Sequence, residues 1–136
     1  MLIADAQVHL WAADTPERPW PAGRHRAHRP EPLGAEELLQ SMNEAGVDRC
    51  VLVPPSWEGE RNDVVLAAAR AYPQRFAVMG RLDPEHPEAR EQLRRSRSLG
   101  MLGLRFTLHR PFSRPLLTEG RMNWVWEDCE RLGLPV

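Results

Sequence analysis

The chain alternates short apolar segments with amphipathic segments of helical period, and this alternation constrains its fold more than any other feature. The apolar segments are predicted as strands at Leu2–His9, Arg49–Val53, Arg75–Leu82 and Leu102–Leu108. The amphipathic segments are predicted as helices at Ala35–Ala45, Asp63–Tyr72, Glu88–Leu99 and Arg121–Leu132. Because strands joined by helical crossovers run parallel, the pattern predicts an α/β fold with a parallel sheet.

Two architectures share this alternation, the doubly wound sheet and the (β/α)8 barrel. A doubly wound nucleotide binder usually has a glycine-rich turn after its first strand. Residues 9–14 follow the first predicted strand and contain no glycine, which favours the barrel.

The length of the chain limits how much of a barrel it can form. A complete barrel needs about 250 residues, and the chain has 136. We therefore expect one partial domain over residues 1–136, the N-terminal half of a (β/α)8 TIM-type barrel from a longer protein. It would hold about four βα units, the start of a fifth strand at its C-terminal end and a long first loop over residues 12–34.

Charge and composition exclude several classes of function. The formal net charge is −1, so the chain has no overall attraction to nucleic acid or to an anionic membrane. The basic run at residues 24–29 contains no aromatic residue and lies in a proline-rich loop, so we expect a solvated loop over the barrel mouth. No segment has the pattern of a signal peptide or a membrane span. Cys50 and Cys129 are expected to be buried thiols of a cytoplasmic protein.

Polar side chains end the first predicted strand. Asp5, Gln7 and His9 share one face by strand alternation, and the carboxyl ends of barrel strands carry the active site. Gln7 and His9 either close the barrel mouth as a hydrogen-bonded pair or bind substrate, and both readings stay open. Asp5 lies deeper and is expected to satisfy a structural donor.

The fourth predicted strand carries the next candidates. Arg105, Thr107 and His109 share one face, so we expect Arg105 to point into the barrel near its mouth, and Arg105 and His109 are candidate substrate-binding residues. A guanidinium there could clamp a substrate carboxylate, or could form an internal salt bridge to Asp83 or Asp5.

The loops after the second and third strands offer further residues. Trp57 is predicted to form an apolar wall of the pocket. Asn62 could contact a ligand, but capping of the following helix is favoured. Asp83 precedes Pro84 and is expected to be a turn residue.

Three motifs together resemble the amidohydrolase-related (amidohydrolase 2) branch of the metal-dependent hydrolase superfamily, close to lactonases and pyrone-dicarboxylate hydrolases. They are Asp5-Ala6-Gln7-Val8-His9-Leu10-Trp11, Gly80-Arg81-Leu82-Asp83-Pro84 and Gly103-Leu104-Arg105-Phe106. The resemblance covers only the first half of that family's domain. It implies a barrel that hydrolyses a lactone, an amide or an ester, or that decarboxylates an aromatic acid.

The family usually opens with His-x-His, which holds a divalent metal, and here Gln7 replaces the first histidine. A carboxamide oxygen is a poor ligand for zinc, so His9 alone would make only a weak site. The expectation is therefore no cofactor, or a weakly held zinc or manganese ion in a full-length form.

The resemblance leads to one favoured function and two alternatives. We expect a hydrolase acting on a lactone, ester or amide of a small, carboxylate-bearing substrate. The alternatives are a metal-dependent decarboxylase and a non-catalytic half-barrel fragment. The expected partner is a small anionic molecule, with no nucleic acid and no membrane, and open sheet edges would favour self-association. The 136 residues alone are expected to be inactive.

Overall fold

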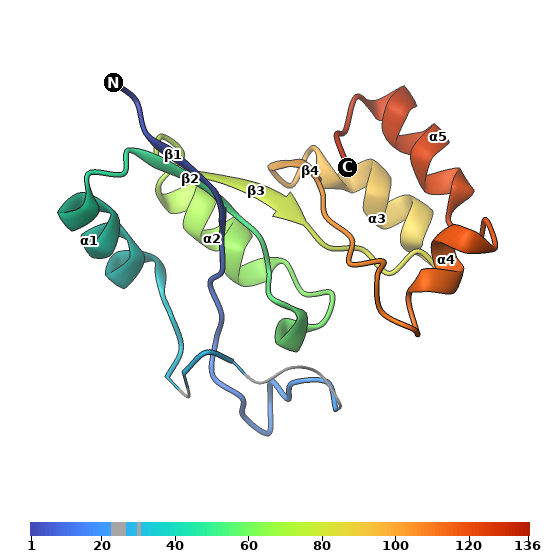
Figure 1. Cartoon of the computed structure of the whole chain (residues 1–136), viewed down its shortest axis with the longest axis horizontal. Coiled ribbons are helices and arrows are strands. Elements are labelled where there is room, and N and C mark those ends of the chain that lie inside the picture. Colours follow the sequence, from blue (N-terminus) through green and yellow to red (C-terminus); the bar gives the residue numbers. More distant parts are fainter. Residues whose placement is uncertain (23–26, 30) are drawn as a thin grey trace.

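A parallel sheet forms the centre of the molecule. The structure is a computed structural model that describes residues 1–22, 27–29 and 31–136. The strands are β1 (Ala4–Val8), β2 (Arg49–Leu52), β3 (Phe76–Gly80) and β4 (Met101–Leu104), and they lie in that order (Figure 1). Each neighbouring pair is parallel. The predicted α/β alternation and parallel sheet are confirmed.

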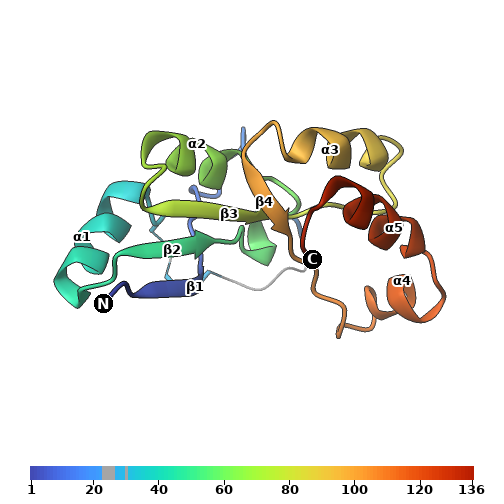
Figure 2. The ribbon, with the colours of Figure 1, turned by 90° about the horizontal axis from the view of Figure 1, so that it is seen from above.

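Helices connect the strands and cover the sheet. The long helices are α1 (Ala35–Ala45), α2 (Asp63–Ala71), α3 (Ala89–Ser96) and α5 (Asn123–Leu132). Figure 2 shows α2 and α3 on the same side of β3. Two short elements were not predicted, the 3₁₀ helix η1 (Ser56–Glu58) and α4 (Arg114–Thr118). Each is too short to show a helical period in the sequence.

The core lies where the helices meet the sheet. Leu52, Val78 and Leu104 come from successive strands and are fully buried. They belong to one hydrophobic cluster with buried residues of the helices, such as Leu93 of α3 and Val125 of α5. Each fully buried side chain of this kind contributes about 1.5–3 kcal/mol, so burial holds the unit together.

The fourth strand is shorter than predicted. It ends at Leu104, whereas the sequence predicted strand structure up to Leu108. The amide of Arg105 still donates to the carbonyl of Gly80 at 2.8 Å, and beyond this bond the chain leaves the sheet. The hydroxyl of Ser113 donates to the carbonyl of Thr107 at 2.6 Å and folds the segment back into a loop.

The last residues lie beside β4, as expected for the start of a fifth strand. The amide of Leu104 donates to the carbonyl of Pro135 at 2.9 Å, and the C-terminus lies near β4 in both views (Figures 1 and 2). The approach is so close that a Cβ on Gly103 would collide with the Pro135 carbonyl oxygen. Glycine at this position therefore permits the pairing.

Candidate functional site

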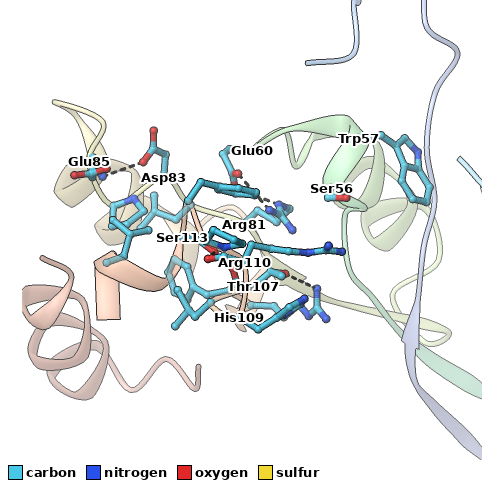
Figure 3. Close-up of a pocket in the computed structure, with 18 of the residues that line it drawn as sticks. Ser56, Trp57, Glu60, Arg81, Asp83, Glu85, Thr107, His109, Arg110 and Ser113 are labelled. Atoms are coloured by element: carbon cyan, nitrogen blue, oxygen red, sulfur yellow. Dashed lines mark hydrogen bonds and ion pairs between the residues drawn. The ribbon is translucent and has the colours of Figure 1, made fainter. Parts of the chain in front are cut away.

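A cavity of about 600 Å³ opens at the carboxyl ends of the strands. Its wall includes His9 after β1, Trp57 of η1 after β2, Arg81 after β3, and residues 105–113 after β4. Figure 3 shows Glu60, Arg81, Thr107 and Arg110 grouped together, with Ser56 and Trp57 to one side. Each strand thus delivers at least one side chain with a polar group to a common space.

His9 is a half-buried histidine with a defined tautomer. Its Nδ1 lies 2.7 Å from the carbonyl oxygen of Val53. A carbonyl only accepts, so Nδ1 carries the proton and Nε2 keeps a lone pair in the neutral ring. Burial lowers the pKa of His9, and the positive charges of Arg105 and Arg81 lower it further. His9 is therefore a neutral hydrogen-bonding group near neutral pH.

Arg105 lies at the cavity, where the sequence predicted it. Its Nη1 donates to Thr107 Oγ1 at 3.1 Å. Its predicted salt-bridge partners are engaged locally. Asp5 Oδ1 accepts the amide of Gln7 at 2.9 Å. Asp83 Oδ1 accepts the amide of Glu85 at 3.0 Å, which confirms Asp83 as a turn residue.

Gln7 does not line the cavity that the other predicted site residues share. It is exposed in β1, and the residues that line the cavity do not include it. The pairing of β1 with β2 is irregular between Asp5 and Val8, and His9 lies beyond the end of the strand. Strand alternation therefore does not carry over from Gln7 to His9. A role for Gln7 in substrate binding stays a prediction.

His109 lines the cavity, but not for the reason given by the sequence. The prediction that Arg105, Thr107 and His109 share one strand face is wrong, because β4 ends at Leu104. Consecutive residues from Arg105 to Ser113 all line the cavity. His109 is exposed on this loop.

Trp57 is 4% exposed and lies in the cavity wall, as the sequence indicated. Its ring meets those of Trp11 and His9 edge-on, with centroids 5.6 and 5.9 Å apart. Trp20 and His28 of the first loop also contact it. An aromatic cluster therefore joins the first loop to η1.

A buried carboxylate that the sequence analysis missed fixes the same loop. Glu58 is 2% exposed, and its Oε1 accepts the amide of Ala12 at 2.7 Å. Its Oε2 accepts from Arg18 at 2.7 Å, and Arg61 lies 3.4 Å away. Arg18 also binds Asp63 at the start of α2. The sequence did not indicate this role, because a single glutamate in a three-residue helix looks like an ordinary surface charge.

Arg81 was also missed as a cavity residue. Asn62 fixes its backbone, since the Asn62 side chain accepts from the Arg81 amide at 2.7 Å and donates to its carbonyl at 2.9 Å. The predicted capping role of Asn62 is wrong, because α2 begins without a side-chain cap bond. The Arg81 side chain is 7% exposed and donates to Glu60.

Part of the basic run lies outside the described residues, namely residues 24–26. Arg29 binds both carboxylate oxygens of Glu37 at 2.7 Å. The Arg29 guanidinium, which ends the basic run, is therefore neutralised by a carboxylate within the chain.

The described residues do not by themselves fit a metal ion. Among residues 1–22, 27–29 and 31–136, no group of three or more His, Cys, Asp or Glu side chains could hold one. His9 offers one imidazole, and Gln7 a weak carboxamide ligand.

Parallel strands alternating with helices, and a polar cavity at the strand carboxyl ends, are the arrangement expected of one half of a (β/α)8 barrel. The family model described as Amidohydrolase matches residues 4–136. The chain belongs to this amidohydrolase family, as its motifs indicated.

Solved structures show the same fold. A probable 2-pyrone-4,6-dicarboxylic acid hydrolase from Acinetobacter baumannii, with citric acid bound, has a TM-score of 0.64 at 19% identity. The match covers 87% of this chain and 45% of that one. A 5-carboxyvanillate decarboxylase from Novosphingobium aromaticivorans, with bound manganese, has a TM-score of 0.67 at 19% identity and covers 98% and 49%. A 2,6-dihydroxybenzoate decarboxylase from Rhizobium has a TM-score of 0.65 at 19% identity and covers 99% and 49%.

The chain thus spans about half the length of these solved structures. A search of curated protein sequences gives no significant match. In the part of the chain that the structure describes, no helix is both long and apolar enough to cross a membrane.

Proposed function

We propose that the amidohydrolase domain to which these residues belong hydrolyses a lactone, ester or amide of a small substrate that carries a carboxylate. The observation that carries this proposal is the position of Arg105 beside His9 in one cavity at the strand carboxyl ends. The resemblance to a probable 2-pyrone-4,6-dicarboxylic acid hydrolase supports the substrate class.

The cavity residues supply binding and orientation. The planar guanidinium of Arg105 can receive a carboxylate through two parallel hydrogen bonds. Neutral His9 presents Nε2 as an acceptor for a substrate hydroxyl or for water. Trp57 closes one side with an apolar surface.

A decarboxylase is the second candidate. Two of the structural relatives are decarboxylases, and they are as similar to this chain as the hydrolase is. The two decarboxylases cover 98% and 99% of this chain, with TM-scores similar to that of the hydrolase. One of them contains manganese. This candidate requires a weakly held zinc or manganese ion with ligands in addition to His9.

Further aspects of the proposal concern compartment and partners. The free, buried cysteines Cys50 and Cys129 suit a reducing cytoplasm. The expected partner is a small anionic molecule rather than nucleic acid or membrane. A non-catalytic half-barrel remains the third candidate.

Turnover by the product of the whole reading frame separates the candidates. The protein is incubated with 2-pyrone-4,6-dicarboxylate or with 5-carboxyvanillate, with and without added Mn²⁺. The hydrolase predicts ring opening of the lactone without added metal. The decarboxylase predicts Mn²⁺-dependent release of CO₂ from the aromatic acid instead. If the protein catalyses neither reaction, the result favours the non-catalytic half-barrel.

A further inference from the structure

Arg81 and Arg105 directly follow the neighbouring strands β3 and β4. The amide of Arg105 donates to the carbonyl of Gly80 at 2.8 Å, so the two arginines follow adjacent strands at the same edge. Both line the cavity of about 600 Å³. Asn62 holds the Arg81 backbone at both its amide and its carbonyl. These two bonds fix the backbone position from which the Arg81 side chain extends into the cavity wall.

The guanidinium of Arg81 is only partly satisfied. Nε and Nη2 donate to Glu60 at 3.2 and 3.3 Å, which is longer than is usual for a charged pair. Nη1 is buried and has no hydrogen-bond partner among the described residues. A buried, unpaired donor on a charged group is unfavourable. An acceptor placed in the cavity would supply the missing partner.

We propose that Arg81 is a second anion-binding residue of the cavity, and that Glu60 sets how strongly Arg81 binds a carboxylate. Nη1 would donate to the carboxylate oxygen, while Nε and Nη2 stay with Glu60. The negative charge of Glu60, which is about one-third exposed, lowers the attraction of Arg81 for an incoming anion. A ligand with two separated carboxylates could then use Arg105 and Arg81 together. This inference rests on the proposed anion-binding function.

Calorimetric titration with isophthalate and with benzoate tests the proposal on the 136-residue chain. Isophthalate presents two carboxylates on a rigid ring, and benzoate presents one. We expect Arg81→Met to weaken isophthalate binding about tenfold or more and to affect benzoate much less. We expect Glu60→Gln to tighten isophthalate binding about threefold to tenfold, because the competing charge is removed.

Arg94→Met serves as the matched control, because Arg94 pairs with Glu91 on the surface of α3. It should leave both affinities unchanged. Far-UV circular dichroism checks that each variant is folded. If Arg81→Met fails to fold, the gain of affinity in Glu60→Gln decides the proposal alone.

The outcomes separate the two assignments. Unchanged isophthalate affinity in folded Arg81→Met, or no gain in Glu60→Gln, would overturn the role of Arg81. Loss of affinity in Arg81→Met with none in Arg105→Met would overturn the Arg105 clamp and leave Arg81 assigned. No binding by the unmodified chain would overturn both.

Discussion

His9 is held by one hydrogen bond and faces several positive charges. Val53 accepts from Nδ1, and Arg105, His28 and Arg81 contribute repulsion that adds to the effect of burial on its pKa. These influences favour the neutral ring. A neutral histidine in a cavity lined by arginines leaves those guanidiniums as the cationic groups for an anion.

The lowered pKa of His9 predicts a pH-dependent stability. In the unfolded chain the ring titrates near its ordinary value of 6.5, whereas in the folded chain it takes up its proton at lower pH. The contribution of His9 is therefore complete above pH 6.5 and is lost as the pH falls toward the folded-state pKa. We expect the free energy of unfolding, measured with urea between pH 7 and pH 5, to fall less in His9→Asn. Asparagine keeps a donor for the Val53 carbonyl and does not titrate. Equal pH dependence in both proteins would show that this account of His9 is mistaken.

Single residues differ in how far the sequence could predict them. His9 and Arg105 were identified because the sequence places both in the carboxyl-terminal parts of predicted strands, and the carboxyl ends of parallel strands meet on the same side of a sheet. Arg81 lies at the end of the third predicted strand, but the sequence carries no signal that its side chain is buried beside the cavity. Gln7 shows the opposite failure, because a local irregularity in pairing breaks the alternation on which its placement rested.

At the scale of elements, η1 and the first loop form one structural unit. Glu58 accepts from Ala12 and Arg18 of the loop, and Trp57 contacts Trp11 and Trp20. Since His9 and Trp57 both line the cavity, the unit positions one side of it. Glu58 is thus a positioning residue for the wall.

Replacement of Glu58 tests this unit. We expect Glu58→Ala to lower the free energy of unfolding by about 3 kcal/mol, because the partly buried Ala12 amide and Arg18 guanidinium lose their buried acceptor. Glu91→Ala removes an exposed pair on α3 and should cost at most about 0.5 kcal/mol. Urea denaturation followed by tryptophan fluorescence measures both. A cost for Glu58→Ala no larger than that for Glu91→Ala would remove Glu58 from this role.

The four strands and the longer helices were predictable from sequence, whereas η1 and α4 were not. Periodicity over ten or so residues identifies an amphipathic helix, and three to five residues carry no period. The loop after β4 was predicted as strand because its residues alternate. In the structure, the bond from Ser113 to Thr107 overrides that local preference. The cavity residues on such loops are therefore the least predictable part of the site.

At the scale of the whole molecule, the sheet has β1 and β4 at its edges. Leu2 and Leu102 are large apolar side chains at or next to these edges, and they are 62% and 59% exposed. Open edges and exposed apolar groups favour association. We propose that the 136-residue polypeptide by itself associates through these edges.

Light scattering coupled to size-exclusion chromatography measures that association. The expected result is a mass above 15.6 kDa that increases with concentration. Leu102→Lys should shift the population toward the monomer, because a charge on an edge strand opposes pairing. A monomer at all concentrations, with no binding of a dye for exposed apolar surface, would contradict the proposal.

The central claim is that the cavity at the strand carboxyl ends binds an anionic ligand through Arg105. The most direct measurement is the dissociation constant of isophthalate for the unmodified chain and for Arg105→Met, by calorimetry at constant ionic strength. The account predicts binding by the unmodified chain that is weakened about tenfold or more in Arg105→Met. Equal affinity in the two proteins, or no binding in either, would contradict it.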